Sequence, residues 1–210
     1  MDGLMLRRRI MAAAFATPLP YDAEVEYIGS DGNHNQFVVT DYTPVVGDEV
    51  YVEFENTEQI TNTQSVFSAG NGNYQLIFLI GTSASGAYIK YFATGAAALL
   101  AYPYSSLNVW HTLTVSSAGV FSIDNNYVAT SATPFEALDG NETNLFLFKL
   151  RNNTSPFLGN IRKFRITNGG QTKLDLIPVR IGQVGYMYDR ISGSFYGNSG
   201  TGDFIVGPDK

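Results

Sequence analysis

The segment from residue 157 to residue 200 constrains the fold more than any other stretch of the sequence. Two strand-like runs, FLGNIRKFRITN and QTKLDLIPVRI, flank the pair Gly169-Gly170, and a third run, VGYMYD, follows. A glycine pair between two such runs is typical of a turn between antiparallel strands. The segment therefore predicts a strand, a turn, a second strand and a closing hairpin. We expect Gly159 to let a neighbouring strand pass closely, because glycine has no side chain.

Short strand-like segments of the same kind fill the chain from residue 21 onward. The segment 49–55 (EVYVEFE) alternates cleanly, which predicts Val50, Val52 and Phe54 on the core side. We predict strands at residues 23–28, 36–40, 49–55, 64–69, 74–80, 87–93, 109–116, 120–123, 127–129, 145–150, 157–167, 173–181, 185–189, 193–196 and 203–206. So many short strands at regular spacing predict an all-β sandwich or jelly roll over residues 21–210.

Composition narrows the classes of function. A chain of 210 residues favours one domain, or one domain with a tail. The chain has no cysteine, which excludes disulfides, thiolate metal sites and cysteine nucleophiles. Its net charge of -6 argues against binding to nucleic acid phosphates. No apolar stretch approaches the roughly 20 residues of a membrane-spanning helix. From the charge we expect no nucleic acid as partner, and from the missing apolar stretch no membrane.

Residues 1–20 (MDGLMLRRRIMAAAFATPLP) differ from the rest and form the only candidate helix, which two prolines would end. We expect a short N-terminal arm, which could be helical, that docks onto another protein. In this arm Arg7, Arg8 and Arg9 would contact an acidic surface through bidentate hydrogen bonds. Two alternatives stay open. The arm could be a solvated basic tail, or a signal peptide whose cationic region precedes a short apolar region and an AFA cleavage site.

Several motifs, in their order along the chain, resemble those of known jelly rolls. Three stretches resemble strands of concanavalin A-like, laminin-G-like domains: residues 108–115 (NVWHTLTV), 121–126 (FSIDNN) and 157–166 (FLGNIRKFRI). Three further stretches resemble jelly-roll proteins of phages and prophages of gut Bacteroidales: residues 19–28, 177–190 and 200–204. The resemblance implies a concanavalin A-like jelly-roll sandwich over residues 21–210, with residues 1–20 as a separate arm.

The resemblance also implies a function. It implies a non-enzymatic structural or adhesion protein of a phage virion, attached to the capsid or tail through residues 1–20. The jelly roll would then face outward and bind a glycan or the host surface. The partners would be other virion proteins and a host-surface glycan, and a homo-oligomer is compatible with this role. The alternatives are a secreted or cell-surface carbohydrate-binding module and a β-glycanase.

Tyr102 and Tyr104 are the candidate ligand-binding residues, because they flank a proline in the loop-like segment 101–106 (AYPYSS). Aromatic faces stack on sugar rings, and the tyrosine hydroxyl adds a hydrogen-bonding group. The alternative is a loop folded back onto the core. We expect Trp110, the only tryptophan, to lie in the core.

Glu53, Glu55 and Glu58 have a spacing similar to the E-x-D-x-x-E motif of glycanases with this fold. Alternation places the first two on one face of a strand, where carboxylates can flank a glycosidic bond. The middle residue is Glu where that family has Asp, the motif lies early in the chain, and the usual neighbouring tryptophans are missing. We therefore expect a solvated strand face, no catalytic residues and no enzymatic activity.

We expect neither a metal nor a cofactor. His34 and His111 are the only histidines, and a two-histidine site would need carboxylates at a spacing that the sequence does not show. The resemblance implies a structural role for His111. The loop 139–142 (DGNE) offers oxygen ligands for calcium, but a single such loop is a weak signal.

Overall fold

A computed structural model describes residues 18–31, 35–58, 63–70, 76–83, 86–93, 96–100, 107–130, 144–150 and 155–210. Within these ranges the regular structure consists of strands, and no helix there could span a membrane. The strands are β1 (Ala23–Glu24), β2 (Ile28–Ser30), β3 (Val38–Val39), β4 (Asp48–Asn56), β5 (Gln64–Ala69), β6 (Leu76–Ser83), β7 (Gly86–Ala93), β8 (Ala96–Leu100), β9 (His111–Val115), β10 (Val120–Ile123), β11 (Asn126–Thr130), β12 (Phe146–Leu147), β13 (Gly159–Asn168), β14 (Gln171–Ile181), β15 (Val184–Asp189), β16 (Phe195–Tyr196) and β17 (Ile205–Val206).

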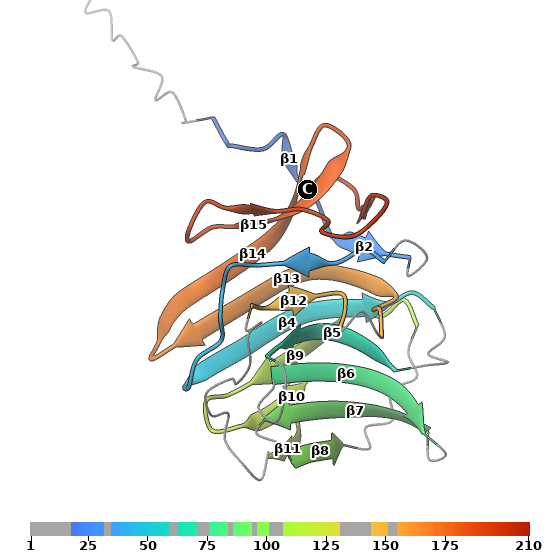
Figure 1. Ribbon diagram of the computed structural model, residues 1–210, viewed down its shortest axis with the longest axis vertical. Helices are drawn as coiled ribbons and strands as arrows, with labels where there is room; N and C mark the ends of the chain where they lie inside the picture. Colours follow the sequence, from blue (N-terminus) through green and yellow to red (C-terminus); the bar gives the residue numbers. More distant parts are fainter. Residues whose placement is uncertain are drawn as a thin grey trace, which may run out of the picture.

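Two antiparallel sheets lie face to face (Figure 1). The larger sheet has the order β11-β10-β9-β4-β13-β14-β15-β16, with β1 paired to β14 and β2 paired to both β13 and β17. The smaller sheet has the order β3-β12-β5-β6-β7-β8. The all-β sandwich predicted from the alternating segments is therefore confirmed.

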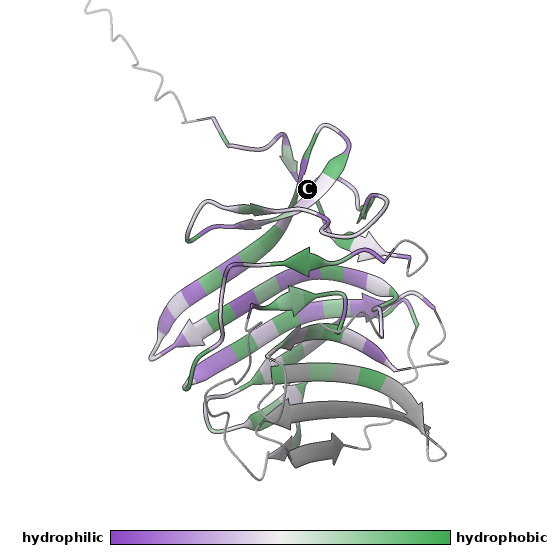
Figure 2. Cartoon of the chain, in the orientation of Figure 1, coloured by the Kyte–Doolittle hydropathy of each residue, from purple (hydrophilic) through white to green (hydrophobic). Residues whose placement is uncertain are grey.

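The core lies between the sheets, as the alternation along the strands predicts. Val50, Val52 and Phe54 of β4 are buried, and Figure 2 shows the alternation of apolar and polar residues along the larger sheet. Aromatic rings meet across the two layers: the centroids of Phe54 and Phe78 lie 5.5 Å apart, and those of Phe67 and Phe164 lie 5.4 Å apart. Both pairs are T-shaped, an arrangement that aromatic rings favour.

The single strand predicted over residues 23–28 is wrong. β1 pairs with β14, an isolated bridge joins Val25 to Asp209, and β2 pairs with β13 instead. Val25 and Ile28 are both fully buried although they are three residues apart, and one regular strand would place them on opposite faces. The chain therefore changes its path between them.

The two glycine predictions in the segment 157–200 are confirmed. Gly169 and Gly170 have φ angles of 56° and 76°, which favour glycine, and they join β13 to β14. At Gly159 an added Cβ would overlap the backbone carbonyl oxygen of Glu55 and would lie 2.7 Å from the Phe157 ring. The absence of a side chain at Gly159 is therefore what lets β13 and β4 pair closely at this end.

Candidate functional site

A row of polar side chains crosses the outward face of the larger sheet. Directly paired residues of neighbouring antiparallel strands share a face. The registers place in one line Tyr127 of β11, Ser122 of β10, Thr114 of β9, Tyr51 of β4, Arg165 of β13 and Asp175 of β14. Since adjacent strands lie about 4.8 Å apart, this polar row is about 24 Å long.

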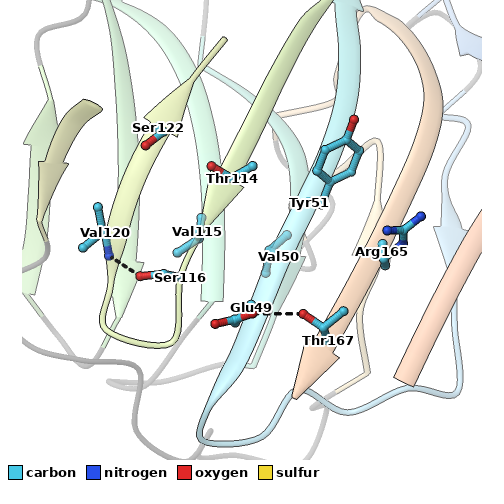
Figure 3. A pocket seen from close by; sticks show the side chains of 10 residues that line it. All are labelled: Glu49, Val50, Tyr51, Thr114, Val115, Ser116, Val120, Ser122, Arg165 and Thr167. Atoms are coloured by element: carbon cyan, nitrogen blue, oxygen red, sulfur yellow. Dashed lines mark hydrogen bonds between the residues drawn. The ribbon is translucent and has the colours of Figure 1, made fainter. Parts of the chain in front are cut away.

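A shallow pocket of about 360 Å³ lies over the middle of the polar row (Figure 3). Its polar lining comes from Glu49, Tyr51, Thr114, Ser116, Ser122, Arg165 and Thr167. The Thr167 hydroxyl donates to Glu49 Oε2 at 3.1 Å, which fixes one rim of the pocket. The hydroxyl groups of Thr114 and Ser122 form no hydrogen bond within the described ranges, so both can donate to a ligand and accept from it.

A β-bulge in β13 places two cations next to the pocket. The register between β13 and β4 shifts between Ile161 and Lys163, so that Arg162 and Lys163 together oppose Glu53. Ile161 is buried in the core, whereas Arg162 and Lys163 both line the outward face. Bulges are frequent beside functional sites, where they redirect a side chain.

Two adjoining hollows, of about 280 and 370 Å³, share Arg162 and Lys210. We call them together the charged groove. The smaller one is also lined by Trp110 and Glu26, and the larger one by Glu24, Glu53, Lys163, Ile177 and Arg190. The charged groove lies beside the pocket, because Tyr51 in the pocket donates its hydroxyl to Glu53 Oε1 at 2.5 Å.

Two of the three carboxylates of the glycanase-like motif have structural partners. Partial burial acts to raise the pKa of Glu53, but hydrogen bonds from Tyr51 and Arg162 outweigh it and lower this pKa below its usual value. A catalytic acid needs a raised pKa instead. Glu55 is buried and accepts a hydrogen bond from Asn160, and Glu58 is exposed after the end of β4.

Trp110 does not lie in the core, contrary to the prediction. It directly precedes β9, whose first residue, His111, is buried, so alternation turns Trp110 to the outward face. There the guanidinium carbon of Arg162 lies 4.5 Å from the centroid of the Trp110 ring, a cation–π geometry. His111 itself packs against Phe54, and its Nδ1 lies 2.7 Å from Asp124 Oδ2.

Several predicted site residues fall outside the described ranges. These are Arg7, Arg8, Arg9, His34, Tyr102, Tyr104 and residues 139–142. Among the described residues, no group of three or more His, Asp or Glu side chains could hold a metal ion. Sequence reasoning missed Tyr51, Thr114, Ser122 and Arg165, which stand far apart in the chain. Their only signal was their outward position on alternating strands.

Solved structures with a fold similar to that of this chain include the following two, whereas no family model and no curated protein sequence matches it. One is a proposed carbohydrate-binding protein from Bacteroides ovatus, with 14% identity and a TM-score of 0.61 over 89% of this chain. This chain spans 61% of that protein's length. The other is a heptameric SAP-like pentraxin from Limulus polyphemus, with 12% identity and a TM-score of 0.57 over 92% of this chain and 98% of the pentraxin. The predicted jelly-roll fold is confirmed.

Proposed function

We propose that this protein is a non-enzymatic glycan-binding domain whose ligand lies along the polar row. The observation that carries the proposal is the pocket, in which the Thr114 and Ser122 hydroxyls lie in the polar row next to Tyr51. Sugars offer hydroxyls for hydrogen bonds and C–H faces for aromatic rings. The carbohydrate-binding description of the Bacteroides ovatus neighbour supports this proposal.

The shape of the site favours an extended ligand. The polar row is accessible from Tyr127, which is 67% exposed at the β11 end, as far as Arg165, whereas Asp175 at the β14 end is only 7% exposed. This accessible part spans four strand spacings, about 19 Å, and can contact several sugar units at once. Each contact would be weak, since an exposed hydrogen bond adds only about 0.5–1.5 kcal/mol, so affinity would come from their sum.

A glycan array tests the proposal with the wild type and the double variant Thr114→Val plus Ser122→Ala. We expect the wild type to bind at least one glycan, and the double variant to bind it about tenfold more weakly, because two hydrogen bonds are lost. Thr172→Val, an exposed residue outside the pocket, is the matched control and should bind normally. Full binding by the double variant, or no binding by the wild type, would contradict the proposal.

Tyr102 and Tyr104 remain the alternative ligand-binding residues proposed from the sequence. Tyr102→Ala plus Tyr104→Ala on the same array separates the two sites. If this variant alone loses binding, the ligand contacts the 101–106 segment instead of the polar row.

The absence of catalysis is part of the proposal. It is supported by the pairing of Glu53 with Arg162 and by the burial of Glu55 against Asn160. We expect neither the wild type nor Glu53→Gln to hydrolyse β-glucans in a reducing-sugar assay. Hydrolysis by the wild type that Glu53→Gln abolishes would establish a glycanase.

We extend the proposal to a phage virion, on the resemblance of residues 19–28 and 177–190 to phage jelly rolls. The domain would bind host glycans from the virion surface, and residues 1–20 with Arg7, Arg8 and Arg9 would attach it to other virion proteins. Deleting residues 1–20 should then abolish incorporation into particles and leave the domain folded. Normal incorporation would contradict the docking role. Cleavage of residues 1–20 during export, seen by mass spectrometry, would favour the secreted module.

A further inference from the structure

The charged groove has a positive balance in an acidic protein. The whole chain has 13 Lys and Arg residues against 19 Asp and Glu residues. The larger hollow of the groove reverses this balance, with four cationic side chains against two carboxylates, and the whole groove, with Glu26 of the smaller hollow, has four against three. We propose that this groove binds the acidic group, a carboxylate or a sulfate, of the glycan. The inference rests on the proposed function and specifies the class of sugar that the protein takes.

Both carboxylates of the larger hollow are already engaged. Glu53 pairs with Arg162 and accepts the Tyr51 hydroxyl, and Glu24 accepts the Tyr21 hydroxyl at 3.1 Å. By contrast, neither Lys163 nor Lys210 forms an ion pair with a carboxylate in the described part of the chain. Two ammonium groups therefore remain for a ligand.

The cations of the groove are held in place by the backbone or by neighbouring side chains. The bulge in β13 sets Lys163 on the outward face, and the Lys210 backbone N–H donates to the Glu24 carbonyl oxygen at 3.0 Å. Arg190 donates from Nε and Nη2 to Asp175 Oδ2 at 3.0 and 2.5 Å. Like charges gathered in this way repel one another, and a bound anion would relieve the repulsion.

The groove and the pocket meet at Tyr51. The Lys163 ammonium lies 5.7 Å from the centroid of the Tyr51 ring, and Tyr51 also lines the pocket. One oligosaccharide can therefore place neutral hydroxyls against Thr114 and Ser122 and an acidic group between Lys163 and Lys210. A neutral glycan would fill the pocket alone.

Matched glycan pairs test this inference. The array would carry uronate, sialylated and sulfated oligosaccharides, each beside its methyl-esterified or desulfated counterpart. We expect the wild type to bind the acidic member at least tenfold more tightly, since each charge-assisted hydrogen bond is stronger than a neutral one. Titration followed by Trp110 fluorescence measures the affinity in solution, because the only tryptophan lines the groove.

Lysine variants locate the acidic group. Lys163→Gln and Lys210→Gln should each weaken binding of the acidic glycan about five- to tenfold and leave binding of its neutral counterpart unchanged. Lys163→Arg keeps the charge and should bind normally. Lys173→Gln removes an exposed charge that does not line the groove, so it is the control. Circular dichroism verifies that each variant is folded.

The outcomes separate the two proposals. Equal binding of acidic and neutral partners, or acidic binding that Lys163→Gln and Lys210→Gln leave intact, would overturn this inference while glycan binding stands. Binding of no glycan at all, acidic or neutral, would overturn the proposed function together with the inference.

Discussion

The side-chain amide of Asn160 donates a hydrogen bond to Oε1 of Glu55 at 2.7 Å, across the pairing of β13 with β4. Both side chains are buried, with 5% and 9% of their surface exposed. A buried carboxylate needs such a partner, because leaving water costs it much solvation. This pair therefore holds together the end of the sheet near the charged groove.

Asn160→Ala should lower the free energy of unfolding by about 1.5–3 kcal/mol, because Glu55 loses a buried hydrogen-bond donor. Denaturation in urea, followed by circular dichroism, measures the loss. Asn126→Ala, at the exposed start of β11, is the control and should cost under about 0.5 kcal/mol. Equal effects of the two substitutions would show that the Asn160–Glu55 bond contributes nothing.

Gly159→Ala should destabilise the domain by about 3 kcal/mol, because the added methyl group overlaps backbone that cannot move without separating β13 from β4. The contrasting change is Gly182→Asn. Gly182 has a φ of 60° with nothing within 4 Å of an added Cβ, and asparagine tolerates this conformation, so we expect a cost within about 1 kcal/mol. Thermal melting compares the two, and a milder effect at Gly159 than at Gly182 would contradict the close approach.

Asp189 should make stability depend on pH in acid. Its burial acts to raise the pKa, but hydrogen bonds from the Ser192 hydroxyl and from three backbone N–H groups outweigh burial and lower the pKa. Because the folded pKa lies below the unfolded one, the unfolded chain binds more protons in acid. This contribution is therefore present above about pH 4 and is lost as pH falls through the folded pKa.

Asp189→Asn should remove this acid dependence and cost about 2–3 kcal/mol at pH 7, because an amide cannot accept all four hydrogen bonds. Urea denaturation of both proteins between pH 2 and pH 7, a range set by the ordinary carboxyl pKa of about 4, tests it. Parallel stability curves for the two proteins would contradict the role of Asp189.

Lys149 is a buried cation, only 2% exposed, whose Nζ lies 3.4 Å from the Phe37 ring centroid. Burial lowers its pKa, so between the folded pKa and the usual value of about 10.4 the unfolded chain binds more protons, and stability rises with pH. Lys149→Met should stabilise the protein by about 1 kcal/mol at pH 7, since it removes the cost of burying a charge. The gain should shrink toward pH 10, a pH near the unfolded lysine pKa. A gain that does not change with pH would point to packing instead.

The sequence predicts a strand well where apolar and polar residues alternate regularly within that strand. Val50, Val52 and Phe54 point inward as expected, because the period of two is a property of any single strand. The prediction fails at residues 23–28. There the path of the chain depends on β13, because β14 pairs with one part of β13 and leaves another part for β2. That choice is made by distant residues, so no local pattern contains it.

The candidate site was less predictable than the fold. The bulge that turns both Arg162 and Lys163 outward depends on the register between β13 and β4, and the polar row depends on five such registers. The sequence of one segment shows which of its residues alternate, but it does not show the register of that segment with its neighbours. Trp110 shows the same limit, since a large aromatic residue is usually buried, yet its position just before His111 turns it toward the groove.

The pairing of β2 has a consequence for how the chain is made. Gly29 in β2 is held on one side by Asn160 and on the other by Ile205, so the sheet cannot close until a segment far along the chain has left the ribosome. Contacts between such distant segments slow folding, because the long loop between them must be closed first. During synthesis, the edge of β2 that pairs with β17 would therefore stay open until β17 emerges, and an open strand edge can pair with other chains.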